Sequence, residues 1–145
     1  MLKNGADFKA AGGMWEVLRA AMGRGKPEVI TVLAKNGLDV NVKDTSSAGQ
    51  TALIYGIVQF HNSRAEVIEA LIKNGADVNA SDDNGTTALM AAAAGYRENL
   101  ETIALLLKNG ADVAMKDKYG KTAMDYAERR RNYSTLKILE NHSMK

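Results

Sequence analysis

The chain has 145 residues, 46% of them hydrophobic, and a formal net charge of +2 at pH 7. It contains no cysteine, which excludes a disulfide framework, a thiolate zinc site and a cysteine nucleophile. No run approaches the ~18 to 20 apolar residues of a membrane span, and no apolar signal core opens the chain. We therefore expect a soluble, cytoplasmic globular domain with no membrane association.

The balanced total charge hides an uneven distribution. Residues 1–50 carry seven basic and five acidic side chains, residues 51–113 carry four and eight, and residues 114–145 carry eight and four. The ends are therefore basic and the middle is acidic. Near-neutral charge argues against nucleic acid as the partner, and no aromatic residues are interleaved with the one dense basic run, 129–131.

Two phrases recur along the chain. Lys-Asn-Gly followed by Ala or Leu and then Asp begins at Lys3, Lys35, Lys73 and Lys108, with the glycines 32, 38 and 35 residues apart. Asn-Gly after an apolar helical run predicts the end of a helix, because glycine adopts the left-handed conformation that closes the last turn. A second phrase places threonine at 51, 87 and 122, where its hydroxyl can cap the next helix.

These signals predict a repeating unit of finger, helix, turn and helix. Residues 1–8 match only the tail of a unit and are followed by a degenerate finger, and the first helix pair is expected over 15–22 and 27–36. Residues 76–86 and 111–121 should form hairpin-like fingers. Apolar spacing of i, i+3, i+4 in 67–72 and 103–107 predicts one buried stripe on each second helix. The last pair is expected over 122–140, with a second helix at 134–141.

The pattern resembles the ankyrin repeat. The pattern consists of Asp-x-x-Gly-x-Thr-x-Leu, then a helix, and then Glu-Val-Ile-x-x-Leu-Ile-x-Asn-Gly-Ala-Asp-Val-Asn. It is clearest in 51–79 and 83–113, and its period is near the family's ~33 residues. The resemblance covers essentially the whole chain. It implies an all-α repeat solenoid of stacked helix-turn-helix repeats with β-hairpin fingers.

We expect one domain over 1–145. Within it, 1–13 hold a partial repeat tail and degenerate finger, 14–43 repeat 1, 44–81 repeat 2, 82–116 repeat 3 and 117–145 a C-terminal capping repeat. Because the chain opens in the middle of a repeat, the start is either a degenerate cap or part of a longer array.

The sequence departs from the family pattern at two kinds of position. The usual Thr-Pro-Leu-His reads Thr-Ala-Leu-Ile at 51–54, Thr-Ala-Leu-Met at 87–90 and Thr-Ala-Met-Asp at 122–125. The polar bonding that the histidine provides between repeats therefore cannot be assumed. The turns at 59–63 and 95–99 are lengthened and carry Phe60 and Tyr96, which either form a second apolar contact site or cover helix ends.

No constellation of residues points to catalysis. His61 and His142 lie too far apart to build a triad or a metal site with each other, and 23–26 and 82–85 lack the spacing of phosphate and calcium loops. We expect no catalytic residue, no metal and no cofactor. In the ankyrin family the asparagine of Asp-Val-Asn can be hydroxylated by a dedicated oxygenase, and Asn41 and Asn79 match that motif.

The resemblance implies that a protein partner binds to the concave face formed by the finger tips and the first helix of each pair. The matching positions are Lys43, Ser46, Ser47, Gln50, Ser81, Asp83, Asn84, Thr86, Lys116, Lys118, Tyr119, Lys121, Gln59, Arg129 and Arg130, with Arg24, Val58 and Ala94 at helix ends.

Two aromatic residues bear on this surface. Tyr119, with its flanking lysines and the arginines of the following helix, is the strongest hot-spot candidate, although its ring could instead pack along its own finger. Trp15 stands where the ankyrin family often has an exposed residue between finger and helix, but in a degenerate first repeat we expect it instead to seal the terminal core.

The leading hypothesis is a monomeric, non-enzymatic adaptor or scaffold whose basic last finger favours a partner with an acidic surface. The alternative is a regulatory or targeting segment of a larger, enzymatic polypeptide. A designed consensus repeat protein is a weaker alternative, because the loop lengths are irregular and Thr-Pro-Leu-His is lost.

Overall fold

The computed structural model describes residues 13–46, 48–60 and 65–145, and the part of the chain that it describes contains eight helices in four successive pairs. Each pair is followed by a loop that leads to the next. The helices are α1 (Gly13–Gly23), α2 (Pro27–Lys35), α3 (Ala52–Gln59), α4 (Ala65–Lys73), α5 (Ala88–Ala93), α6 (Leu100–Lys108), α7 (Ala123–Arg130) and α8 (Tyr133–Ser143).

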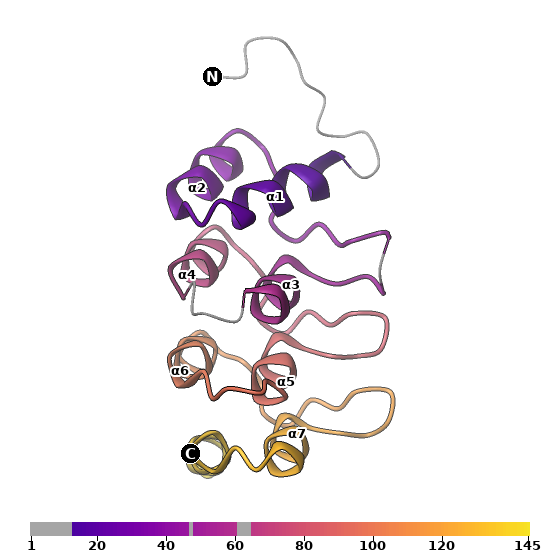
Figure 1. Cartoon of the computed structure of the whole chain (residues 1–145), viewed down its shortest axis with the longest axis vertical. Coiled ribbons are helices and arrows are strands. Elements are labelled where there is room, and N and C mark those ends of the chain that lie inside the picture. The colour runs from indigo at the N-terminus through magenta and orange to yellow at the C-terminus, as the bar shows by residue number, and fades with distance from the viewer. Residues whose placement is uncertain (1–12, 47, 61–64) are drawn as a thin grey trace.

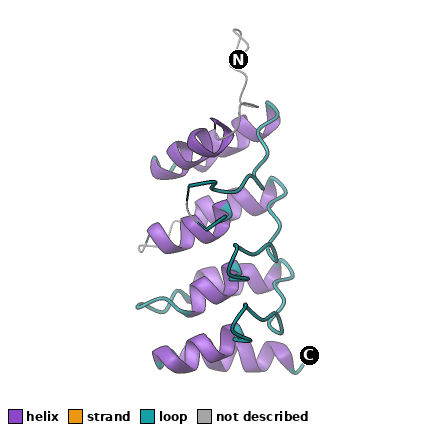
Figure 2. Cartoon of the chain, turned by 90° about the vertical axis from the view of Figure 1, so that its right-hand side faces the viewer, coloured by secondary structure: helices purple, strands orange, loops and turns teal. Residues whose placement is uncertain are grey.

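The pairs stack along the long axis of the molecule (Figure 1). The helices α1, α3, α5 and α7, here called the inner helices, form one column, and the outer helices α2, α4, α6 and α8 form the other. The fingers, the loops before α3, α5 and α7, project from the inner column, and the view turned by 90° shows the pairs as successive layers (Figure 2). The predicted all-α repeat solenoid is confirmed.

The predicted helix boundaries depend on two kinds of cap, and both are present. Gly37, Gly75 and Gly110 have φ of 94°, 93° and 87°, the left-handed conformation that ends α2, α4 and α6. At the other end, the hydroxyl oxygens of Thr51, Thr87 and Thr122 each accept a hydrogen bond of 3.3 Å from the backbone N–H three residues later.

One hydrophobic core runs through all four pairs. Every inner and outer helix contributes to it, and the predicted stripes of α4 and α6 face inward, with Leu71, Ile103 and Leu106 fully buried. Trp15 is only 2% exposed and meets the ring of Tyr55 edge to face at 5.3 Å, so it seals the first layer of the core as expected. Among the described residues no helix is long and apolar enough to span a bilayer.

The fingers are turns with little β-structure. In the described residues, pairing between their arms is limited to single antiparallel bridges at Lys43–Thr51 and Ser81–Thr87. The hairpin expected over 76–86 is therefore reduced to the single bridge Ser81–Thr87, and the finger expected over 111–121 is a turn closed by the Asp117 N–H to Lys121 O at 3.0 Å, with no bridge between its described arms. The turns are closed by backbone hydrogen bonds such as Asp82 N–H to Thr86 O at 3.0 Å.

Successive fingers are joined through their backbones. The Asp83 N–H donates to Ala48 O and the Lys118 N–H donates to Asn84 O, each at 2.9 Å. The second of these contacts needs glycine at position 85, where φ is +77° and a Cβ would lie 3.0 Å from the Asp117 Cα. These three fingers, called the second, third and fourth after the repeats that they begin, therefore form one continuous edge.

Two asparagines connect neighbouring repeats at the bases of the fingers. The Asn41 side chain donates to Gly75 O at 2.9 Å and accepts from the Asp77 N–H at 2.8 Å. Asn79 makes the same pair of bonds one repeat later, to Gly110 O at 3.0 Å and from the Asp112 N–H at 2.8 Å. These amides supply polar bonding between repeats in a chain that lacks the family's histidine.

We predict that Asn79→Ala lowers the free energy of unfolding by about 1–2 kcal/mol, because it leaves two backbone groups without their partner. Asn79→Asp keeps the acceptor for Asp112 but loses the donor to Gly110 O, so its effect should be smaller than that of the alanine. Urea unfolding followed by circular dichroism measures both changes. Asn141→Ala, at an exposed position of α8, is the control, and equal midpoints for Asn79→Ala and this control would contradict the prediction.

Candidate protein-binding surface

The finger face, defined as the fingers together with the exposed sides of the inner helices, holds most of the residues predicted to meet a partner. Of the predicted residues on the fingers, those exposed are Lys43, Ser46, Asp83, Lys116, Lys118, Tyr119 and Lys121, and those half-buried are Gln50, Ser81, Asn84 and Thr86. Gln59, Arg129 and Arg130 are exposed at the ends of α3 and α7. Ser47 lies outside the described residues, as does His61.

Two predicted lysines are engaged with the neighbouring finger. The Lys43 ammonium donates to Ser81 O at 2.7 Å, and the Lys118 ammonium donates to the side-chain oxygen of Asn84. The Lys118 ammonium also lies 5.1 Å from the centre of the Tyr119 ring, a cation–π contact. Part of the predicted contact set therefore also holds the fingers together.

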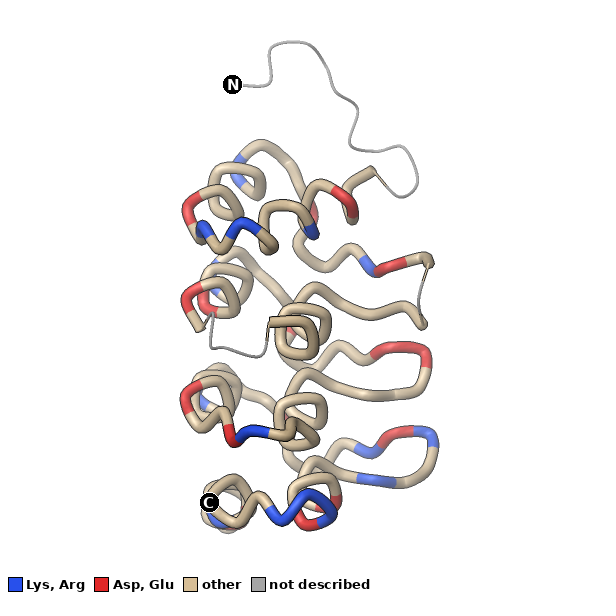
Figure 3. The backbone as a smooth tube through the Cα atoms, viewed as in Figure 1, with Lys and Arg blue, Asp and Glu red and all other residues tan. Residues whose placement is uncertain are grey.

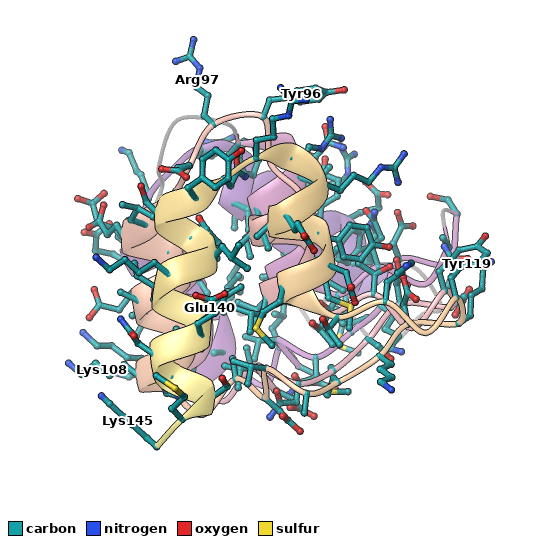
Figure 4. All side chains as sticks on the ribbon, turned by 90° about the horizontal axis from the view of Figure 1, so that it is seen from below. Tyr96, Arg97, Lys108, Tyr119, Glu140 and Lys145 are labelled. Atoms are coloured by element: carbon teal, nitrogen blue, oxygen red, sulfur yellow. The ribbon has the colours of Figure 1, made fainter. Side chains whose placement is uncertain are left out.

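Lysines and arginines outnumber aspartates and glutamates along the fourth finger and α7 (Figure 3). A hollow of about 490 Å³ lies between them and is lined by Tyr119, Lys121 and Arg129, with Asp125, Tyr126 and Glu128 among them. The Tyr119 side chain is 71% exposed at the finger edge (Figure 4), so its ring is largely open to solvent. The structure therefore brings together Tyr119, Lys121 and Arg129 from the predicted hot spot.

Arg130 is directed elsewhere. Its guanidinium lies 4.2 Å from the centre of the Tyr96 ring, at the turn that joins α5 to α6. Tyr96 is 87% exposed and lies, with Arg97, well away from Tyr119 in the end-on view (Figure 4). The predicted basic cluster is thus divided between two places, one beside the fourth finger and one at the turn after α5.

A second hollow, here called the α3–α5 groove, runs between two inner helices and has a volume of about 390 Å³. Gln50 and Thr86 line the end near the fingers, and Phe60 and Tyr96 line the end near the turns. Its other apolar lining residues are Ile54, Ile57, Val58, Ala91, Ala92 and Ala94. Gln50, Thr86, Val58 and Ala94 were expected on this face, and Phe60 and Tyr96, expected either to form a second apolar contact site or to cover helix ends, both line this groove.

The turn that carries Tyr96 is fixed by the last repeat. The buried Asn132 side chain donates to Ala93 O at 3.0 Å and to Gly95 O at 3.1 Å. The Glu98 carboxylate accepts from the Ser134 N–H at 3.0 Å. Sequence reasoning missed Asn132 and Glu98, and the available signal was only an asparagine at a helix start beside an unusually long turn in the preceding repeat.

Another missed pair lies beneath the fourth finger. The Tyr126 hydroxyl donates to the Asp117 carboxylate at 2.5 Å, and the same carboxylate accepts from the Tyr119 and Lys121 N–H groups. Burial alone would raise the pKa of Asp117, but these hydrogen bonds outweigh it and lower that pKa. The hydrogen bond to Asp117, followed by burial, raises the pKa of Tyr126 to about 12.

In the part of the chain that the structure describes, no three His, Cys, Asp or Glu side chains cluster as metal ligands would. The three buried finger carboxylates, Asp44, Asp82 and Asp117, instead accept hydrogen bonds from their own turns. The acidic phrase at 82–85 is therefore a finger turn, closed by the Gly85 N–H to Asp82 O at 3.0 Å.

We predict that Tyr126→Phe lowers the free energy of unfolding at pH 7 by about 1–2 kcal/mol, because Asp117 loses a hydrogen-bond donor. The pKa of Tyr126 is near 12 in the folded state and is ordinarily 10.0. The hydrogen bond from its hydroxyl therefore stabilises the fold fully below pH 10, and this stabilisation is lost as the pH rises from 10 to 12. The difference between wild type and Tyr126→Phe should therefore narrow over that range in urea unfolding. Tyr133→Phe, at an exposed ring, is the control, and a difference independent of pH would refute the assignment.

Comparison with known proteins agrees with this geometry. The sequence model of a family described as ankyrin repeats (3 copies) matches residues 1–82 and 57–144, which is almost the entire chain. No curated protein matches the sequence significantly. Proteins of the family are generally non-catalytic modules that bind other proteins. The match covers both halves of the sequence, and the repeated caps, stacked helix pairs and joined fingers agree with it. This chain therefore belongs to the ankyrin repeat family.

Proposed function

We propose that this chain is a non-enzymatic interaction module that binds a protein partner through its finger face. The observation that carries the proposal is the position of the two hollows, the α3–α5 groove and the hollow beside Tyr119, which both open on this face. Concave, partly apolar surfaces with a few convergent polar groups are where proteins bind ligands. The module acts as an adaptor or scaffold, in the cytoplasm and as a monomer.

The charge of the finger face favours a partner with an acidic surface. Lys116, Lys118 and Lys121 lie on the fourth finger, and Arg129 and Arg130 end α7 (Figure 3). Exposed tyrosine and arginine side chains supply much of the energy of protein interfaces, and Tyr119 and Arg129 line one hollow. Complementary charge also raises the rate of encounter and selects against partners of the same sign.

The proposal is tested by capture from a lysate of the source organism on immobilised protein. The finger-face variant Lys118→Glu/Lys121→Glu/Arg130→Glu is compared with an outer-helix variant, Lys35→Glu/Lys73→Glu/Lys108→Glu, which changes the net charge equally at exposed lysines that end α2, α4 and α6. We expect the finger-face variant to lose the partner and the outer-helix variant to retain it.

Thermal unfolding of both triple variants serves as the folding control, because all six positions are exposed. A partner retained by the finger-face variant would show that the wrong face has been chosen. Loss of the partner only in the outer-helix variant would place the binding surface on the opposite column.

A further inference from the structure

The α3–α5 groove joins an apolar channel to a cationic end. The apolar part comes from Ile54, Ile57 and Val58 on α3 and from Ala91 and Ala94 of the α5 segment. Val58 is 37% exposed in this channel, so an apolar patch faces solvent on the surface proposed to bind a partner. The volume of about 390 Å³ lies within the ~300 to 1,000 Å³ typical of ligand pockets.

The cationic end is at the inter-helix turns. Tyr96 and Arg97 line the groove there, and the Arg130 guanidinium lies on the Tyr96 ring at 4.2 Å. Among the described side chains no carboxylate is within ion-pair distance of Arg97 or Arg130. The nearby Glu98 carboxylate is already used by the Ser134 N–H. Arg97 therefore lines the mouth of the apolar groove without a carboxylate partner, and Arg130, which does not itself line the groove, lies against the Tyr96 ring that does.

The opposite end of the groove is acidic. Asp82 lines it, and the exposed Asp83 follows on the third finger. One Asp82 oxygen accepts from the Asn84 and Thr86 N–H groups, which partly satisfies this carboxylate within the finger. A bound segment with carboxylates would be repelled at the finger end and attracted at the turn end, so the groove has a preferred direction.

The wall that carries Tyr96 is held in place before any partner arrives. Asn132 binds the two carbonyls at the start of the turn, and Glu98 binds the backbone of α8. A preformed wall reduces the entropy lost on binding. An exposed aromatic ring on a fixed turn, with a guanidinium over its face, is suited to an anchor contact.

We infer that the α3–α5 groove binds a short linear segment of the partner that inserts an apolar side chain and presents an acidic residue to Arg130 and Arg97. This inference rests on the proposed function and names the chemistry of its ligand. The apolar anchor lies against Val58 and Ile57, and the acidic flank lies toward the Tyr96 turn.

The test uses a random library of twelve-residue peptides displayed on phage and selected against the full chain. The expected consensus contains a large apolar residue with Asp or Glu on one side of it. Enriched peptides are then synthesised with a fluorophore, and their dissociation constants are measured by fluorescence anisotropy. Replacing their acidic residues by the corresponding amides should weaken binding and remove most of its dependence on salt.

Matched variants locate the peptide on the protein. Val58→Glu and Arg130→Glu should each weaken binding at least about tenfold, the effect of losing one buried anchor or one charge contact. Val32→Glu, at a 54% exposed valine of α2, and Lys108→Glu, at the end of α6, are the controls and should change affinity less than about twofold. Figure 4 shows Lys108 on the side of the molecule away from Tyr119.

A consensus without acidic residues, or affinities that survive Val58→Glu or Arg130→Glu, would overturn the inference. If no peptide is enriched while a lysate partner is still captured through the finger face, the inference fails and the proposed function stands. If selected peptides bind the groove but the finger-face triple variant captures the partner as wild type does, the proposed function fails for that partner.

Discussion

The structure depends on one constraint, which is that none of the helices in its described residues is long enough to be stable alone. The described helices have six to eleven residues, and isolated helices shorter than ~12 to 15 residues are marginal in water. Each pair must therefore bury its apolar side against the next pair, and the core that results passes through all four layers. The alanines of α5 allow close packing on α3 and α7, and the finger face is the surface left open once the layers are aligned.

Besides the hydrogen bonds between fingers and the bond from Asn74 to Thr31 on the outer column, side-chain amides bond the layers at the finger bases and at the inter-helix turns. At the finger bases, Asn41 and Asn79 each join a loop to the next repeat through two hydrogen bonds. At the inter-helix turns, Asn132 reaches back from the last repeat to the carbonyls of Ala93 and Gly95. Apolar contact can slide, whereas these bonds fix one relative position of neighbouring layers. The bonds of Asn132 also affect the surroundings of Arg130, because the turn that they hold carries Tyr96, and the Arg130 guanidinium lies over the Tyr96 ring.

Helix order, caps and buried stripes could be predicted from the sequence because each depends on residues a few positions apart. Thr87 caps α5 through an N–H three residues on, and Gly75 ends α4 within its own turn. The contact of Arg130 with Tyr96 joins positions 34 residues apart and depends on the rotation of α7 about its axis, which no local pattern reveals. For the same reason the sequence could not show how the predicted group of Tyr119, Lys118, Lys121, Arg129 and Arg130 is arranged. Arg129 lines a hollow with Tyr119 and Lys121 whereas Arg130 lies on Tyr96, since consecutive residues on a helix point in directions about 100° apart.

The arrangement of charge on the finger face restricts what the face can bind more than its net charge does. Arginines stand at the turn end of the α3–α5 groove, and aspartates stand at the finger end of the same groove. The fourth finger, one repeat further along, is basic at the edge where the third finger is acidic. A uniformly acidic partner would meet repulsion at the third finger, and a uniformly basic one would meet it at the fourth finger and at both arginines. On the partner proposed above, acidic groups are therefore favoured opposite the fourth finger and the Tyr96 turn and disfavoured opposite the third finger.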